Sequence, residues 1–225
     1  VDTPDVRDVM IEPGQPLTKY ERHVDVLWTS AEAMAIYLAG PGFAKDGQRP
    51  FLDRLELESG KTTRVFQSEA AYLEAVTDLL DSGARRFITS RESNREPRNF
   101  WLRQPGKKTG TQLTDFADPA PALTTSQRIQ FTFMRPDSVK LNAEAVLPAG
   151  WKPGTALPTV FWIYPNDFRS ATAASQNRRS PNRFPSQSPL NPEVLVTQGY
   201  CVVYPDIAVV GTNDRYVPEI QMSAQ

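Results

Sequence analysis

The sequence predicts a mixed fold, in which an antiparallel β region precedes the beginning of an α/β sheet. Short apolar or alternating stretches, separated by Gly, Pro and Asp turns, fill residues 1–123, which is typical of antiparallel strands. The proline-spaced segment Phe116–Pro121 interrupts this pattern. After it come a hairpin, an apolar run, a loop, a helix signal and a second apolar run, an order typical of α/β sheets. We therefore expect two domains, 1–123 and 124–225.

The first region contains two sets of predicted strands on either side of a helical pattern. The strands of the two sets are Val24–Trp28, Ala33–Gly40, Phe51–Leu57 and Thr62–Gln67, followed by Arg85–Ser90 and Asn99–Gln104. Glu58-Ser59-Gly60 is a hairpin-turn sequence within the first set. Ser68–Leu80, with apolar residues at three- and four-residue spacing behind Ser68, is predicted to be an amphipathic helix. The two strand sets resemble successive blades of a β-propeller, and since a propeller needs about four to eight blades, a larger ring is expected.

The second region follows the order in which an α/β-hydrolase sheet begins. Gln130–Met134 and Val139–Val146 alternate around an Arg-Pro-Asp-Ser turn, which predicts a hairpin. The continuous apolar run Thr159–Ile163 predicts a strand buried on both faces, with Tyr164, Asn166 and Asp167 just past its carboxyl end, where such sheets bind ligands.

Two further elements are predicted downstream of the arginine-bearing loop that follows this strand. A helix over Asn191–Gln198 is expected to stop at Gly199. Tyr200–Tyr204 is then a second buried strand. The predicted fold is therefore β-propeller blades followed by the start of an α/β-hydrolase domain.

The charge and the cysteine count exclude several classes of protein. The 225 residues carry 25 basic and 26 acidic side chains, a net charge of −1, so no global field attracts nucleic acid or an anionic membrane. No apolar run approaches the roughly 18 residues of a membrane helix. The single cysteine, Cys201, lies in an apolar stretch, which excludes an internal disulfide and predicts a buried, inert thiol. The compartment stays open, a periplasmic or secreted location in a bacterial source being one alternative.

The residues needed for a complete active site are absent from this sequence. A serine hydrolase of the expected fold needs a Ser on a G-x-S-x-G turn, an Asp and a His, and no such turn occurs. The only histidine, His23, is predicted to be a surface residue on a charged stretch. One His and one Cys cannot supply a zinc site, and no glycine-rich phosphate loop is present, so neither a metal nor a cofactor is expected.

Several stretches resemble the prolyl oligopeptidase family of serine peptidases, most closely its glutamyl endopeptidase branch. The resemblance rests on Leu141–Gly154, Leu157–Phe184, Val196–Gly211 and Asn213–Val217, and on Gln48–Val76 and Ile88–Arg103, which look like the last blades of the same branch. It implies a propeller that covers an α/β-hydrolase domain, with the Ser, Asp and His carboxyl-terminal to the matched part. The acidic loop usual in the branch is shortened between Gly211 and Asn213. We therefore expect a piece of a larger enzyme, whose partners are the remaining blades and hydrolase portion.

The resemblance gives Tyr164 a role. In the family, the tyrosine that ends this strand donates its hydroxyl to the oxyanion, and removing one such donor typically costs about 2.7–4 kcal/mol of transition-state stabilisation. The alternative is a tyrosine that ends a core strand with its hydroxyl in solvent.

Four arginines, Arg169, Arg178, Arg179 and Arg183, form the second candidate site. Their guanidinium groups suit a substrate carboxylate, as a Glu-preferring peptidase requires. The alternative is a solvated basic loop.

The expected function is therefore part of a serine peptidase that acts on peptide substrates, with cleavage after Glu as the expected specificity. Three alternatives remain open: a peptidase of different specificity on the same fold, an acyl-hydrolase of that fold, and a binding or scaffold protein that has lost catalysis.

Overall fold

The structure, a computed structural model, describes residues 12–44, 47–185, 188, 190–211 and 216–223. They divide into two compact units. The N-terminal unit consists of the described residues of Met10–Asp118 together with Arg178–Phe184. The C-terminal unit is formed by the described residues of Pro119–Asn177 and Pro185–Gln225. No helix among the described residues is long and apolar enough to cross a membrane.

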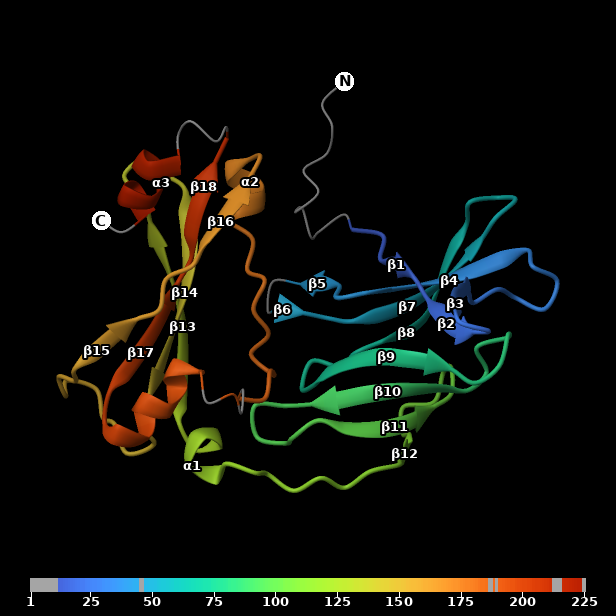
Figure 1. Cartoon of the computed structure of the whole chain (residues 1–225), viewed down its shortest axis with the longest axis horizontal. Coiled ribbons are helices and arrows are strands. Elements are labelled where there is room, and N and C mark those ends of the chain that lie inside the picture. The colour runs from blue at the N-terminus through green and yellow to red at the C-terminus, as the bar shows by residue number, and fades with distance from the viewer. Residues whose placement is uncertain (1–11, 45–46, 186–187, 189, 212–215, 224–225) are drawn as a thin grey trace. The chain divides into compact units, whose positions relative to one another are not determined.

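The first sheet of the N-terminal unit has the strand order β1-β4-β7-β8, and every neighbouring pair is antiparallel. Its strands are β1 (Gln15–Pro16), β4 (Ala35–Gly40), β7 (Phe51–Glu56) and β8 (Thr62–Gln67). The predicted turn between the last two is confirmed, with Gly60 at a φ of 67° that glycine adopts without strain. Figure 1 shows these strands lying side by side.

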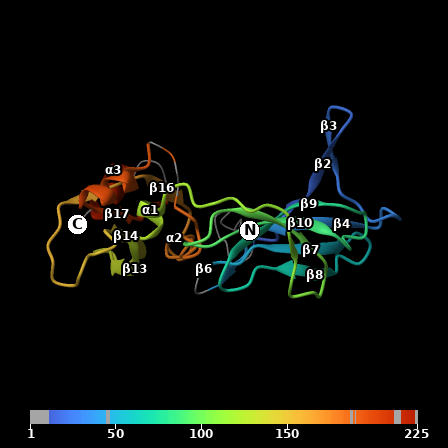
Figure 2. The same ribbon diagram turned by 90° about the horizontal axis from the view of Figure 1, so that it is seen from below.

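The second sheet of this unit is another antiparallel array of four, in the order β12-β11-β10-β9. Its strands are β9 (Leu73–Leu79), β10 (Phe87–Glu92), β11 (Asn99–Arg103) and β12 (Thr111–Gln112). Two short hairpins complete the unit: β2 (Thr18–Glu21) with β3 (Val24–Leu27), and β5 (Phe43–Ala44) with β6 (Gly47–Gln48). The β2–β3 hairpin projects away from the sheets (Figure 2), and His23 at its turn is exposed, as predicted.

The core of the N-terminal unit is built from both sheets. Tyr37, Leu52, Leu79 and Phe87 belong to one buried cluster, to which the strands β4, β7, β9 and β10 each contribute one side chain. The Tyr37 hydroxyl donates to the carbonyl of Ser82 at 2.7 Å, which satisfies the one polar atom that this ring brings into the core. Burial raises the pKa of this phenol above its usual value.

The predicted helix over Ser68–Leu80 is wrong, because this stretch forms a turn followed by β9. The Ser68 hydroxyl closes the turn: it accepts from the backbone N–H of Glu74 and donates to the carbonyl of Tyr72. Glu74 is then fixed as a buried strand residue by Arg103 of β11, whose Nη2 lies 2.6 Å from Glu74 Oε2. The segment pairs with β10 as a strand, and its ion pair with Arg103 crosses the same sheet, so tertiary pairing replaces the helix that the apolar spacing indicated.

The C-terminal unit contains a four-stranded sheet in the order β13-β14-β17-β15. The strands are β13 (Gln127–Met134), β14 (Lys140–Leu147), β15 (Thr159–Phe161) and β17 (Cys201–Pro205). β13 and β14 form the predicted hairpin, β17 pairs antiparallel with β14, and β15 pairs parallel with β17. A second parallel pair joins β16 (Pro165–Phe168) to β18 (Ile207–Val210).

Short helices accompany these strands. They are α1 (Pro121–Thr124), α2 (Ala171–Ala174), the 3₁₀ helix η1 (Pro192–Gln198) and α3 (Tyr216–Ser223). The helix predicted over Asn191–Gln198 is confirmed in place, as a 3₁₀ helix: Asn191 Oδ1 accepts from the N–H of Glu193, and Gly199 ends the helix with a φ of 88°. A glycine at this position permits the left-handed backbone that stops the helix.

The prediction that Thr159–Ile163 is a central strand buried on both faces is wrong. β15 is shorter and lies at the edge of its sheet, paired with β17 alone among the described strands. Phe161, Trp162 and Ile163 are all about half exposed or more. An apolar run becomes buried on both faces only if strands or helices cover both faces. None of the described elements covers both faces of this run.

Candidate functional site

The candidate site lies where the parallel pairing of the C-terminal unit is interrupted. Thr159 pairs with Cys201 in β15–β17 and Pro165 pairs with Ile207 in β16–β18, so the same register resumes after a break. Within the break the N–H of Trp162 still donates to the carbonyl of Val203 at 2.9 Å. The backbone of this segment is therefore anchored to its neighbour on both sides of Tyr164.

Tyr164 occupies this break, just beyond the carboxyl end of β15. Its side chain is 76% exposed, and its backbone carbonyl accepts from Asn166 Nδ2 at 3.2 Å. Because the backbone is held at both ends while the ring is exposed, the phenol can present its O–H to a group outside the unit. A neutral donor on an anchored strand end is suited to stabilising a developing negative charge.

Asn166 and Asp167, the other two residues expected past the strand end, belong to β16 instead of a loop. Both are exposed, whereas Phe168 at the end of the strand is buried against α2 and β14 in one apolar cluster with Ala173 and Leu141. Proline begins this strand without loss of a ladder hydrogen bond, because the first residue of a strand need not donate one.

The four predicted substrate arginines are divided between the two units. Arg169 follows β16 in the C-terminal unit, and Arg178, Arg179 and Arg183 belong to the N-terminal unit. Arg183 Nη2 donates to Gln48 Oε1 at 3.3 Å. The segment that carries the last three, Arg178–Phe184, is referred to below as the strap. The sequence places the four side chains on one loop, but the fold divides this loop between two units.

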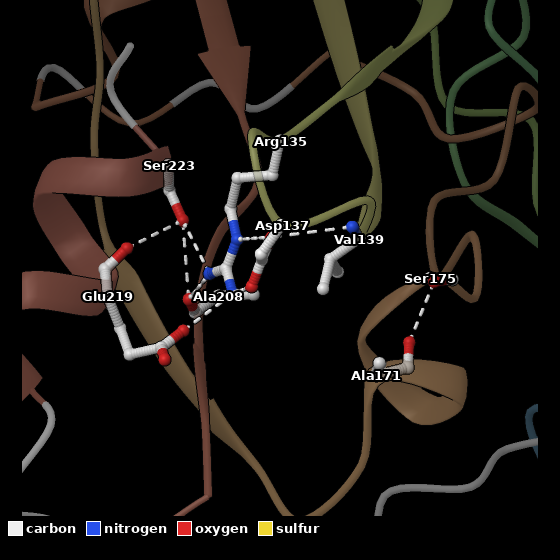
Figure 3. Close-up of polar contacts among 8 residues, drawn as sticks. All are labelled: Arg135, Asp137, Val139, Ala171, Ser175, Ala208, Glu219 and Ser223. Atoms are coloured by element: carbon white, nitrogen blue, oxygen red, sulfur yellow. Dashed lines mark hydrogen bonds and ion pairs between the residues drawn. The ribbon is translucent and has the colours of Figure 1, made fainter.

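A buried ionic network around Arg135 in the C-terminal unit was not foreseen (Figure 3). The Arg135 side chain is 1% exposed, as is that of Glu219 in α3. Arg135 Nη2 donates to Glu219 Oε2 at 2.6 Å and to Asp137 Oδ2 at 2.5 Å, while Nη1 donates to the Ala208 carbonyl of β18 at 2.7 Å and to Ser223 Oγ at 3.1 Å.

This network fixes three segments to one another. The hydrogen bond to Asp137 raises the pKa of the Arg135 guanidinium, and the same bond lowers the pKa of the Asp137 carboxyl below its usual value. The hairpin turn, β18 and α3 are thereby joined through one side chain. The sequence offers no local signal for this role, because an Arg-Pro-Asp-Ser turn reads as an exposed hairpin end.

Three further expectations concern Cys201, the stretch after Gly211 and metal binding. Cys201 is buried, as predicted, and burial raises the pKa of its thiol. The stretch between Gly211 and Asn213 and most of Asn213–Val217 fall on positions 212–215, which lie outside the described residues. The part of the chain that the structure describes contains no group of three or more His, Cys, Asp or Glu side chains able to hold a metal ion.

Comparison with known proteins gives two curated relatives. The chain is 31% identical over 239 aligned residues to "Probable glutamyl endopeptidase, chloroplastic" of Oryza sativa subsp. japonica, covering 97% of this chain and 26% of that protein. It is 30% identical over 211 residues to the protein of the same name from Arabidopsis thaliana, covering 86% of this chain and 22% of that protein. The chain thus spans about a quarter of the length of these relatives. No family model matches it.

A solved structure shares the fold at low sequence identity. A putative dipeptidyl aminopeptidase IV from Bacteroides ovatus matches with a TM-score of 0.56 and 13% identity, over 81% of this chain and 24% of that one. At this level of identity the likeness concerns the arrangement of the chain and carries no information on substrate.

Proposed function

Because this chain belongs to the prolyl oligopeptidase family, with relatives named glutamyl endopeptidase, we propose that it is part of a serine-type peptidase that cleaves peptide bonds after Glu. The names of the two relatives support a peptidase-related function. The serine mechanism, the specificity and the roles of single residues are the proposal. The catalytic Ser, Asp and His would come from outside these 225 residues, since the chain holds no G-x-S-x-G turn and only His23.

The same proposal extends to the architecture. The two four-stranded antiparallel sheets of the N-terminal unit would be the last blades of a β-propeller within residues 1–123. Residues 124–225 would be the N-terminal part of an α/β-hydrolase domain, in which the parallel pair β15–β17 begins the central sheet. The half-exposed apolar edge at Phe161–Ile163 supports this reading, because such a surface suits a further strand or helix.

Tyr164 is proposed as a donor to the oxyanion. The observation that carries the proposal is its geometry: an exposed phenol on a backbone anchored on both sides, past the carboxyl end of a parallel strand. Sheets of this kind place ligands at that edge. A phenol O–H that meets the oxyanion only as charge develops would lower the barrier without tightening substrate binding.

The test is the substitution Tyr164→Phe in the catalytically active protein that carries this chain. It deletes the donor and keeps the ring, so we expect kcat to fall about 100- to 1,000-fold at nearly constant KM, with unchanged thermal unfolding. Tyr200→Phe, at another exposed tyrosine of the same unit, is the matched control and should leave kcat unchanged. An unaltered kcat in Tyr164→Phe would remove this residue from the mechanism.

Recognition of the Glu side chain is proposed to involve the arginines Arg169, Arg178, Arg179 and Arg183. A guanidinium paired with a substrate carboxylate discriminates against neutral side chains, because a neutral substrate leaves the cation desolvated and unpaired. Each arginine is changed to Gln in turn, and kcat/KM is measured for peptides with Glu and with Gln at the cleavage position. An arginine that contributes to recognition is identified by a smaller ratio of kcat/KM for Glu over Gln peptides in its variant. If all four variants keep the parent's preference, specificity resides elsewhere.

A further inference from the structure

The N-terminal unit contains a cavity of about 400 Å³. The cavity has an apolar part and a polar part. Its apolar part is formed by both four-stranded sheets and includes Ala39 of β4 with Leu73 and Val76 of β9. The polar residues are Gln48, Ser90, Glu92, Arg98 and Arg183. This volume and this division suit a small molecule with an apolar body and a charged head.

Glu92 is the unusual member of the lining. It ends β10 opposite Leu73, and its side chain is 5% exposed. Its Oε2 accepts from Arg98 Nε at 2.9 Å, but none of the described residues donates a hydrogen bond to Oε1. A buried carboxylate oxygen without a donor costs free energy that an N–H group brought by a ligand would recover.

Arg183 reaches the same cavity on the strap. The strap is held to the N-terminal unit by Asn182 Nδ2, which donates to the carbonyl of Ala70 at 2.7 Å. It also passes close to Gly47, where a Cβ would lie 2.8 Å from the Arg179 carbonyl oxygen and 2.8 Å from Pro181 Cδ. A glycine at φ 115° therefore permits the approach that places Arg183 beside the cavity.

The charges of the lining specify the kind of ligand. One carboxylate oxygen, Glu92 Oε1, lacks a donor among the described residues, and the guanidinium groups of Arg98 and Arg183 bring more N–H donors than Glu92 and Gln48 take up. A simple cation would face two arginines, and a simple anion would face the buried carboxylate. A molecule that carries both an N–H cation and a carboxylate, with an apolar side chain, complements all three surfaces.

We propose that this cavity binds a small apolar zwitterion, of the chemical class of an amino acid or short peptide, whose ammonium donates to Glu92 Oε1 and whose carboxylate accepts from Arg183. The site lies wholly within the N-terminal unit. It is independent of the proposed oxyanion role of Tyr164, but it shares Arg183 with the proposed recognition of a substrate Glu. Dipeptide binding and the preference for Glu over Gln peptides are separate measurements, so failure of one proposal can be told from failure of the other.

The test is calorimetric titration of the 225-residue chain with the dipeptide leucyl-leucine, its N-acetyl derivative and its C-terminal amide. We expect one dipeptide per chain, with binding weakened about tenfold or more by either modification, because each removes one charged hydrogen bond. In Glu92→Gln, the affinity for the free dipeptide should fall to that of the N-acetyl form, so that the two ligands bind equally. In Arg183→Gln, the affinity for the free dipeptide should fall to that of the C-terminal amide, so that these two ligands bind equally.

Matched controls remove the same charges elsewhere on the N-terminal unit. Glu96→Gln and Arg85→Gln change exposed side chains that do not line this cavity and should leave dipeptide binding unchanged. Because the Arg183 side chain is exposed, Arg183→Gln should fold, and its dipeptide affinity tests the proposal even if Glu92→Gln fails to fold. Absence of dipeptide binding at millimolar concentration, or equal binding by the parent and Arg183→Gln, would overturn the proposal.

Discussion

Among the described residues, each unit contains one deeply buried arginine, and the two are neutralised by different sets of carboxylates. Arg103 in the N-terminal unit has one carboxylate partner, Glu74, in a pair whose side chains are 7% and 1% exposed. Thr89 Oγ1 of the intervening strand donates to the same Glu74 at 2.5 Å. Arg135 in the C-terminal unit has two carboxylate partners, Glu219 and Asp137, the second of which is 35% exposed.

The sequence distance between the partners differs as well. Arg103 and Glu74 are 29 residues apart and are joined through successive hairpins, whereas Arg135 and Glu219 are 84 residues apart. Closing a longer loop costs more entropy, although the cost grows only slowly with length. The N-terminal pair therefore belongs to a locally connected sheet, and the C-terminal pair fastens a distant helix to a hairpin turn.

The largest expected effect follows from removing Glu74, the one described carboxylate that pairs with Arg103. Glu74→Gln leaves a buried guanidinium without a counter-charge, so we expect the free energy of unfolding of the N-terminal unit to fall by about 3–5 kcal/mol. Urea unfolding measures this loss. The control Glu96→Gln removes a carboxylate that is 55% exposed and lies 3.7 Å from Arg91, and it should cost less than about 1 kcal/mol. If Glu74→Gln lowers the free energy of unfolding as little as the control does, the Arg103–Glu74 pair is exposed to solvent.

A smaller effect is expected in the C-terminal unit. In Glu219→Gln, Arg135 keeps Asp137 as its counter-charge, so the loss of stability should be about 1–3 kcal/mol. Hydrogen exchange should show the loss at the backbone amides of α3, which Arg135 no longer holds as tightly. If Glu219→Gln destabilises as much as Glu74→Gln, the second carboxylate does not compensate, and the comparison between the two arginines fails.

The smallest effect concerns pH. The pKa of Asp137 is lowered in the folded protein, chiefly by the hydrogen bonds from Arg135, so its contribution to stability is present above the unfolded value of about 3.8 and is lost as the pH falls through the lower folded pKa. The stability difference between the parent and Asp137→Asn should therefore be constant from pH 7 to about pH 5 and shrink only below about pH 3.8. If the stability difference between the parent and Asp137→Asn already shrinks near pH 6, a group other than Asp137 causes the pH dependence.

Local features of the fold could be predicted from the sequence because they depend on residues a few positions apart. The turn around Gly60, the hairpin turn Arg135–Ser138 and the end of η1 at Gly199 are all in place. Each depends on the backbone that a glycine or a short polar turn permits, and such preferences act within the segment itself. The same holds for the exposed His23 and the buried Cys201.

The tertiary structure alone decided which side chains meet. Leu73–Leu79 is a strand that pairs with β10, and its Glu74 meets Arg103 of β11, and no pattern within the segment indicates either pairing. The run Phe161–Ile163 is exposed because no described element covers it, although its composition is that of a core strand.

Tertiary packing likewise assigns Arg183 and Arg169 to different units and places Arg183 in the lining of the cavity with Glu92. Burial and ion pairing are properties of surfaces that the chain brings together across tens of residues. The sequence by itself therefore determined the turns, most strands and the family, and tertiary packing determined which charges are buried, which apolar residues remain exposed and where a ligand can bind.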